Sequence, residues 1–331
     1  MNDKTGLKNL KFQMKIGPEK LSLSLEDFIR EHMDKLEREG VILGLSGGID
    51  SAVVAALCKR AVGSEKTLAL MMPEKDSREE HVKDALNFAK ELGIATRLID
   101  ITPYLKELEV YKLAPLSRIP FLGRLRGPLI KKAYRYYERK TGENPFSASL
   151  TGFKDKQFNS FLKTKNAFYR IKHRLRMVLL YLYGELENRL VVGAANKTEY
   201  QIGYFVKHGC DDATDIMPLL NLYKTQVKEL ARYLNIPSRI IEKPPSPDII
   251  PGIIDEEAIG IPYEKLDLIL LALEKGWEIP EIAKALGMEE KRVVYVKNLI
   301  QKSEHMRKIY APHPDSQPTS LNCLDPKATP H

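Results

Sequence analysis

The chain has 331 residues, of which 43% are apolar, and a formal net charge of +8. This length and apolar content suit a globular protein and exclude a disordered chain, and no apolar run is long enough to span a membrane. The polar, charged start of the sequence lacks the apolar stretch of a signal peptide, so we expect a cytoplasmic protein. The basic excess favours anionic partners such as nucleotides, polyphosphates or nucleic acid, without choosing among them.

The first part of the chain alternates helical and strand-like patterns. An amphipathic pattern predicts a helix over 25–40. Apolar runs predict strands over 41–45, 67–72 and 95–101, and helical patterns between them cover 49–62 and 78–92. Strands that alternate with helices predict an α/β fold, with a doubly wound, mostly parallel sheet flanked by helices.

The segment 108–163 interrupts this alternation. It contains four prolines, and eight basic residues but one acidic residue lie between Arg118 and Lys140. We interpret it as a basic insertion with one or two helices, which serves as a solvated lid or a dimer contact. An arm that binds RNA or another anion is the alternative interpretation.

After the insertion the alternation resumes and then becomes helical. The predicted elements are a helix over 167–186, a strand over 189–193, a helix over 198–205, a short fifth strand over 215–217 and a helix over 225–234. Three further helices over 263–275, 279–286 and 290–302 form a helical C-terminal part. We therefore expect one domain over 1–310 with the insertion inside it, and a disordered tail over 311–331, which is poor in apolar residues.

The three cysteines are scattered. Cys58, Cys210 and Cys323 form no CxxC pair, so their spacing indicates neither a zinc site nor a disulfide framework.

A glycine-rich segment, Gly-Leu-Ser-Gly-Gly-Ile-Asp-Ser, follows the first predicted strand and opens a helix. Ligands of open α/β sheets bind at the carboxyl ends of strands, and the amides of a helix N-terminus favour phosphate. Glycines let the backbone approach a ligand closely, and a carboxylate beside a phosphate site indicates Mg²⁺. We assign to an ATP site Gly44, Ser46, Gly47, Gly48, Ile49, Asp50 and Ser51. A turn that merely tightens the connection is the simpler alternative.

The loop is not a Walker motif, since GxxxxGK[ST] does not occur in it. It resembles the PP-loop of the ATP pyrophosphatases, which split ATP between the α and β phosphates. Further blocks can separate members of that group; they lie at 191–199, 203–207, 215–219, 222–227, 242–246, 251–252, 255–256 and 303–305. Taken in this order, the blocks resemble those of the NAD synthetases. The resemblance covers 41–307 apart from the insertion, and the family's fold is of the adenine nucleotide alpha-hydrolase type.

The resemblance implies an ATP-dependent ligase that amidates nicotinic acid adenine dinucleotide (deamido-NAD) to NAD. The nicotinate carboxylate attacks the α-phosphate of ATP, pyrophosphate leaves, and ammonia attacks the acyl-adenylate and releases AMP. No glutaminase module is visible, so ammonia is used directly or supplied by a separate protein. The resemblance also implies a homodimer with the substrate site near the subunit boundary.

Residue roles follow from the same resemblance. Asp50 and Glu199 hold Mg²⁺, and Ala194, Lys224 and Ser246 lie at the ATP site. The catalytic residues are Asp50, Lys224 and Asp215, the last as a base that takes a proton from ammonium. Contacts to the dinucleotide substrate come from Arg174, Arg176, Lys207, Asp215 and His305. On their own, loop lysines are usually solvated, and Arg174 and Arg176, two positions apart, cannot share a helix face.

Four positions depart from the family pattern. The family has threonine where Ala194 stands, asparagine where Arg170 stands, and lysine after the histidine where Met306 stands, and the run 208–214 is one residue longer here. These departures leave open a PP-loop enzyme that adenylates or amidates another carboxylate. A tRNA-modifying protein is a further alternative, although unpaired cysteines argue against thiolation. A regulatory protein without turnover is disfavoured by Asp50, Glu199 and Lys224.

Overall fold

The computed structural model describes residues 3–111, 126–152, 156–245 and 254–307. The expected tail over 311–331 lies outside these ranges. Among the described helices, none combines the length and the apolar content that a membrane crossing requires.

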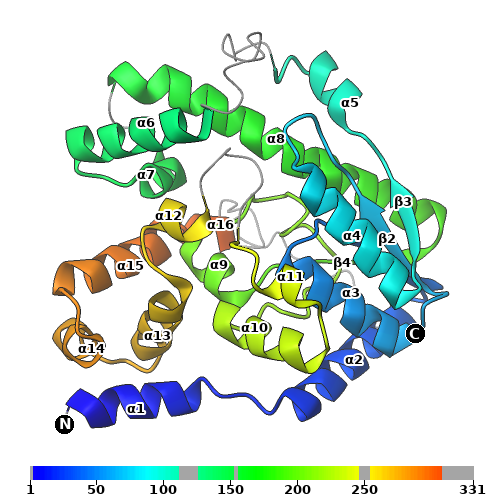
Figure 1. The fold of residues 1–331 in the computed structure, drawn as a ribbon, viewed down its shortest axis with the longest axis horizontal. Helices are drawn as coiled ribbons and strands as arrows, with labels where there is room; N and C mark the ends of the chain where they lie inside the picture. Colours follow the sequence, from blue (N-terminus) through cyan, green and yellow to red (C-terminus); the bar gives the residue numbers. More distant parts are fainter. Residues whose placement is uncertain (1–2, 112–125, 153–155, 246–253, 308–331) are drawn as a thin grey trace, which may run out of the picture.

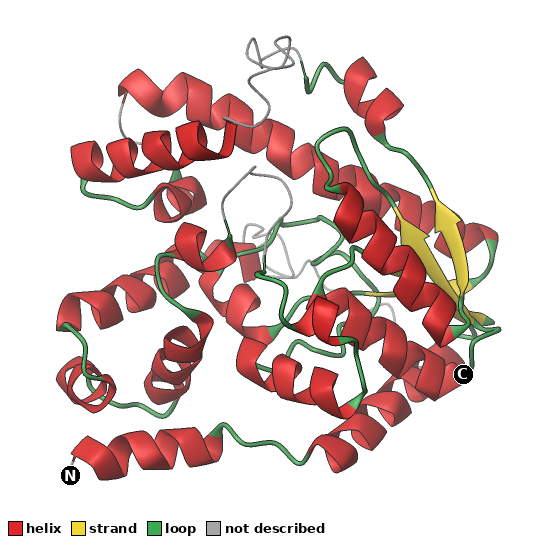
Figure 2. Ribbon diagram, viewed as in Figure 1, coloured by secondary structure: helices red, strands yellow, loops and turns green. Residues whose placement is uncertain are grey.

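A four-stranded sheet organises one half of the molecule (Figures 1 and 2). Its strands are β1 (Gly40–Gly44), β2 (Thr67–Met71), β3 (Ala95–Leu98) and β4 (Arg189–Val192). All pair in parallel in the order β3-β2-β1-β4, with Ile42 of the central strand opposite Leu68 and Val191. Their carboxyl ends therefore share one edge of the sheet, as the predicted α/β fold requires.

Side chains alternate between the two faces of the sheet, and each face has its own helices. Val41 and Leu43 pack on the first face, whereas Ile42 packs on the second. The first face is covered by α2 (Pro18–Lys35), α3 (Ile49–Val62), α4 (Glu79–Leu92), α10 (Lys224–Tyr233) and α11 (Ser238–Ile241). The second is covered by α5 (Thr102–Glu107) and α8 (Lys156–Leu186). The doubly wound sheet is confirmed.

The expected fifth strand over 215–217 is wrong. Ile216 makes one isolated parallel bridge with Val192, and no ladder continues from it. Asp215 uses its side chain to accept the amide of Val191, and Pro218, which has no N–H, cannot extend a ladder.

A second hydrophobic core lies between helices beside the sheet. Most of its helical residues come from α1 (Asp3–Gln13), α9 (Lys197–Ile202), α12 (Asp255–Ile259), α13 (Tyr263–Glu274), α14 (Ile279–Leu286), α15 (Glu290–Lys302) and α16 (Glu304–Arg307). The first of these, α1, was not predicted; it packs on α13 and α14, far from it in sequence.

The insertion contributes α6 (Arg126–Thr141) and α7 (Pro145–Thr151), and α8 begins at Lys156, earlier than predicted. The Tyr134 hydroxyl donates to the carbonyl of Ala258 at 3.0 Å, and Lys302 Nζ donates to Glu143 at 2.5 Å and to Ser147 at 2.9 Å. The described part of the insertion is thus attached to the C-terminal helices (Figure 1).

Candidate active site

The glycine-rich loop joins the carboxyl end of β1 to α3. Gly47 has φ +80°, and a Cβ at this position would overlap the carbonyl oxygen of His81, so a side chain is excluded there. Gly48, with φ −90°, is the residue before α3, and a Cβ there would meet only the Ser46 hydroxyl, at a tight 3.3 Å. The loop therefore presents the N-terminus of α3, where unpaired amides favour anions.

The two serines of the loop hold its shape. Ser46 Oγ accepts the amide of Gly48 at 3.2 Å and lies 3.0 Å from Ser51 Oγ. Ser51 Oγ donates in turn to the carbonyl of Gly48 at 3.0 Å. The serines predicted to contact ATP thus also pre-form the loop.

Two carboxylates meet one buried ammonium beside this loop. Lys224 Nζ lies 2.5 Å from Asp50 Oδ2 and 2.9 Å from Glu199 Oε1, and the lysine is only 2% exposed. The three residues come from α3, α9 and α10, which are far apart in sequence. The structure therefore brings together the three site residues for which the sequence predicted ATP and Mg²⁺ chemistry.

Hydrogen bonds at the first residues of α9 and α10 position the side chains of Asp50, Glu199 and Lys224. Asn196 caps α9: its Oδ1 accepts the amide of Glu199 at 3.0 Å, and its Nδ2 donates to Asp50 Oδ1 at 3.1 Å. The amide of Lys224, the first residue of α10, donates to Thr198 Oγ1 at 2.9 Å. One capping residue and one threonine thus link both helices to the loop.

Asp267, a fully buried aspartate of α13, stabilises the first turns of α9 and α10. It accepts the Thr198 hydroxyl at 2.6 Å, and the amide and hydroxyl of Thr225 at 2.8 and 2.7 Å. Burial raises the pKa of Asp267, and the three donors offset part of that effect.

A third carboxylate adjoins the group. Tyr263 Oη lies 3.1 Å from Glu199 Oε1 and 3.2 Å from Asp255 Oδ2, and the Tyr204 hydroxyl donates to Asp255 at 3.0 Å. Burial raises the pKa of Glu199 to about 7, and the charges of Asp50 and Asp255 add to this effect. Burial also raises the pKa of Asp255.

For Lys224, burial and the neighbouring charges shift the pKa in opposite directions. Burial by itself would lower its pKa, but attraction to Asp50 and Glu199 outweighs burial and raises the pKa of Lys224 above its ordinary value. The group therefore carries three carboxylates against one ammonium. Asp50 and Glu199 offer hard oxygen donors that already converge on one cation, and this is the donor set that fits Mg²⁺.

The predicted substrate contacts form a second set. The Arg174 guanidinium donates to the carbonyl of Lys207 at 3.3 Å, and Lys207 Nζ donates to the carbonyl of His305 at 2.9 Å. Arg176 Nε donates to the carbonyl of Met72, directly after β2, at 3.1 Å. The structure thus links Arg174, Lys207 and His305 to one another.

Three other predicted residues are placed differently. Asp215 lies at the β4 edge, where its carboxylate accepts the Val191 amide at 2.8 Å and the Tyr181 hydroxyl at 3.1 Å; none of its described partners belongs to the Lys224 group. Ala194 follows β4 and packs against the first core. Ser246 lies outside the described residues.

The sequence left several residues of the site without a role. Asn196 donates to Asp50, and the Tyr263 hydroxyl lies within hydrogen-bond distance of both Glu199 and Asp255. Lys243 Nζ pairs with Asp84 and donates to the carbonyl of Gly47 at 3.3 Å. Asn196 carries a signal, because asparagine before a helix is a favoured cap. For the others, only the fold gives the proximity.

The sequence matches the family model described as NAD synthase over residues 21–116 and 140–310. A relative from Thermotoga maritima named NH(3)-dependent NAD(+) synthetase is 41% identical over 285 residues, which are 86% of this chain and 96% of the relative. Residues 117–139 of the insertion fall between the two matched ranges, and the rest of 108–163 lies within them.

Two solved structures have a similar fold. The NMN synthetase from Francisella tularensis is 28% identical, with a TM-score of 0.66 over 91% of this chain and 100% of its own. The NH3-dependent NAD synthetase from Campylobacter jejuni, solved with a nitrate ion, is 28% identical, with a TM-score of 0.62 over 90% of this chain and 100% of its own.

Proposed function

The chain belongs to the NAD synthase family, and from this premise we propose that it amidates deamido-NAD to NAD with ATP and ammonia. The reaction passes through an acyl-adenylate and releases pyrophosphate and AMP. The observation that carries the proposal is the convergence of Asp50, Glu199 and Lys224 beside the glycine-rich loop, at the edge of the sheet where an α/β fold binds its ligand.

Each group of site residues has its own role in adenylation. The N-terminus of α3 and the amides of the loop bind the phosphates, and the Lys224 ammonium offsets charge that develops on them. Asp50 and Glu199 hold Mg²⁺, which when bound neutralises phosphate charge as a Lewis acid. Arg174 and Lys207 lie on the side of the site that we assign to the dinucleotide, where a guanidinium suits phosphate.

A second candidate substrate has specific support. The Francisella tularensis structure carries the name NMN synthetase, and NMN is the mononucleotide counterpart of NAD. The sequence departs from the family pattern mainly near the predicted dinucleotide contacts, as at Arg170 and Met306. An enzyme with the same adenylation site and the mononucleotide acid as its substrate is therefore the alternative.

One experiment distinguishes the two. Purified protein is incubated with ATP, Mg²⁺ and ammonium, and with either deamido-NAD or nicotinic acid mononucleotide. We expect NAD, AMP and pyrophosphate in equal amounts with deamido-NAD, and at least about tenfold lower kcat/KM with the mononucleotide, because the second nucleotide provides binding energy. A higher kcat/KM for the mononucleotide would transfer the proposal to the alternative substrate.

The assembly and the setting are part of the proposal. We expect a homodimer in the cytoplasm, where ATP is available, with ammonia taken directly or from a separate donor. We also propose one domain over 1–310 that carries the insertion. The bonds from Tyr134 and Lys302 that attach the insertion to the C-terminal helices support this organisation.

A further inference from the structure

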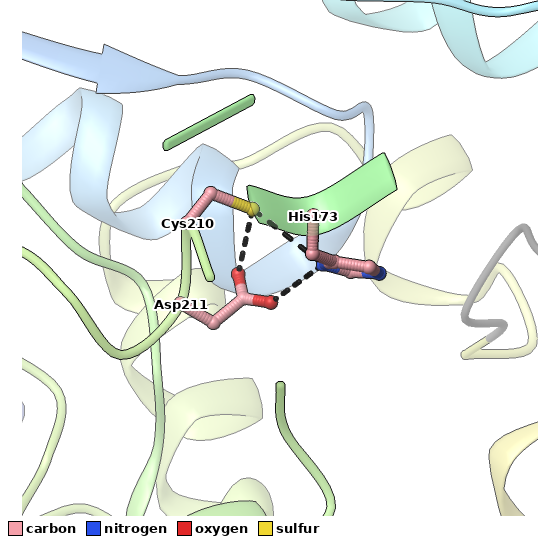
Figure 3. Close-up of side chains that lie close together, drawn as sticks. All are labelled: His173, Cys210 and Asp211. Atoms are coloured by element: carbon pink, nitrogen blue, oxygen red, sulfur yellow. Dashed lines mark hydrogen bonds and ion pairs between the residues drawn. The ribbon is translucent and has the colours of Figure 1, made fainter. Parts of the chain in front are cut away.

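A second group of three different side chains lies beside the predicted substrate contacts Arg174 and Lys207. His173 comes from α8, and Cys210 and Asp211 come from the loop that follows α9 (Figure 3). His173 Nδ1 lies 3.6 Å from Cys210 Sγ and 3.2 Å from Asp211 Oδ2, and Cys210 Sγ lies 3.8 Å from Asp211 Oδ1. One nitrogen, one sulfur and one carboxylate thus face a common point.

We propose that His173, Cys210 and Asp211 bind a thiophilic divalent cation of the zinc class. Bonds of about 2.3 Å to sulfur and about 2.0–2.2 Å to nitrogen or oxygen put neighbouring ligands of a tetrahedral zinc ion about 3.3–3.7 Å apart. His173 Nδ1 lies 3.6 Å from Cys210 Sγ and 3.2 Å from Asp211 Oδ2, close to that range. The 3.8 Å contact of Cys210 Sγ is to the other carboxylate oxygen, Oδ1, and one ligand atom from each residue lies within 4.8 Å of the other two. Sulfur and imidazole in one set favour zinc over Mg²⁺, which prefers oxygen.

The backbone holds the ligands in place. The Cys210 amide donates to the carbonyl of His173 at 3.2 Å, so the loop is attached to α8 at the site itself. A Cβ at Gly209 would crowd both His173 and the carbonyl of Val206, and glycine therefore permits the close approach. His173 Nε2 is buried and has no hydrogen-bond partner among the described residues. Among the described residues, the ring makes a tilted contact with the Tyr169 ring, and its polar contacts are those of Nδ1 within the cluster.

The geometry argues against a nucleophilic cysteine. A catalytic Cys–His–Asp arrangement uses the two ring nitrogens separately, one for the thiol and one for the carboxylate. Here the same Nδ1 faces both partners. Burial, followed by the charge of Asp211, raises the pKa of the Cys210 thiol well above its ordinary range, so the free thiol is not activated.

The cluster offers a divalent cation two anionic ligands, and the positive charge of Arg176 acts on both of them. The cation would displace the thiol proton, as metal binding to cysteine does, and meet one thiolate and one carboxylate. The side chain of Asp211 is 40% exposed, which leaves a water access to a fourth position. Because Arg174, next to His173, also donates to the carbonyl of Lys207, the bound cation would fix the loop over 207–211 against α8 at two points.

The test uses the full chain freed of metal by chelation and then titrated with Co²⁺. We expect one equivalent to give a thiolate-to-cobalt charge-transfer absorption, which Zn²⁺ abolishes by displacement and excess Mg²⁺ leaves in place. The melting temperature should rise on addition of Zn²⁺, because a ligand that binds the folded state stabilises it. Cys210→Ser should lose the absorption, and His173→Ala should bind at least about 100-fold more weakly, since even outer partners of metal ligands change affinity 10–100-fold.

Two matched variants remove the other thiols. Cys58→Ala and Cys323→Ser should keep the absorption at one equivalent. Absence of the absorption in the unmodified chain, its persistence in Cys210→Ser, or its loss in Cys323→Ser would each overturn the proposal. The fold of each variant is checked by circular dichroism without metal. If Cys210→Ser does not fold, Asp211→Asn decides, because an unaltered Co²⁺ affinity and spectrum in that variant would contradict a three-ligand site.

Discussion

At the scale of single residues, Asp50 is the side chain on which the loop, the cap and the lysine converge. It faces Lys224 Nζ and Asn196 Nδ2 at once. Replacement by asparagine keeps the shape but removes the charge, so the site would lose a proposed metal ligand, while Glu199 remains as a carboxylate partner of the buried Lys224.

We therefore expect Asp50→Asn to lower the rate of pyrophosphate release by on the order of 100-fold or more, with a melting temperature close to that of the unaltered chain. Release is measured with ATP, Mg²⁺ and deamido-NAD. Asp27→Asn, at an exposed position of α2, is the matched control and should keep full activity. Turnover at the unaltered rate in Asp50→Asn would refute the assigned role.

If Glu199 is a Mg²⁺ ligand as proposed, Mg²⁺ binding should depend on pH. Burial raises the pKa of Glu199 to about 7, so a proton and the cation would compete for one carboxylate near neutrality. Protonation removes the ligand, so affinity falls as pH falls: we expect Mg²⁺ to bind about tenfold more weakly per pH unit below 7, and to gain little above 8. Activity titrations with Mg²⁺ from pH 6 to 8.5 measure this.

Asp255→Asn provides the control for this effect. It removes a negative neighbour that contributes to the raised pKa of Glu199, so the pH midpoint should move to lower pH. A Mg²⁺ affinity that is constant over the whole range would contradict the assignment of Glu199 as a ligand.

Gly47 and Gly48 form a natural pair for comparison. Gly47→Ala forces a side chain into a positive-φ position against the carbonyl of His81, and we expect a loss of about 2 kcal/mol or more in the free energy of unfolding. Gly48→Ala has an ordinary φ and meets only the Ser46 hydroxyl, at 3.3 Å, so its loss should stay below about 1 kcal/mol, while its ATP affinity should fall through the added bulk beside the proposed phosphate site. Urea unfolding and ATP titration measure both, and equal destabilisation would contradict the argument.

At the scale of elements, α13 determines where α9 and α10 begin. Asp267 accepts three bonds from residues of the two helices that deliver Glu199 and Lys224. The helices were predicted from their patterns, but this connection was not, because a buried aspartate in a helix has no sequence signature of its partners.

Asp267→Ala leaves the donors of Thr198 and Thr225 unsatisfied, at about 1–3 kcal/mol for such buried groups. We expect lower stability together with a raised KM for Mg²⁺ and ATP, because Glu199 and Lys224 lose their positions. Glu264→Gln, exposed on the same helix, should change neither quantity. Loss of stability with unchanged KM would show that Asp267 serves the core alone.

Element boundaries show where local patterns suffice. The helix predicted over 49–62 is α3 as observed, because a mostly apolar sequence between two glycines marks both ends of the helix. The strand predicted over 215–217 failed because the side chain of Asp215 took the amide that a ladder needs. The start of α8 was missed, since no periodic signal marks it before residue 167.

At the scale of the whole molecule, an apolar stripe on α8 supports the proposed homodimer. Val178, Leu182 and Leu186 recur every fourth residue and are 53%, 46% and 70% exposed. Single exposed apolar side chains are ordinary, but a row on one helix face indicates a contact surface.

We expect the protein to elute with twice its chain mass of 37.7 kDa in size-exclusion chromatography with light scattering. Leu182→Asp should shift it toward the single-chain mass, because a charge would be buried in the interface. Leu23→Asp, at an exposed position of α2, should remain dimeric. Elution of the unaltered chain as a monomer would refute the proposed homodimer.

The sequence by itself determined the sheet, the glycine-rich loop and the family, because these depend on patterns that are local along the chain. The patterns are the alternation of strands and helices, glycines after a strand, and blocks in a fixed order. It also named Asp50, Glu199 and Lys224, whose proximity the structure shows. Only the tertiary structure decided that Asp255 and Asp267 adjoin or support this group, that Asp215 lies at a strand edge, and that Cys210, unpaired in sequence, meets His173 and Asp211. Contacts between residues far apart in sequence follow from how helices pack across the sheet, and no local pattern encodes them.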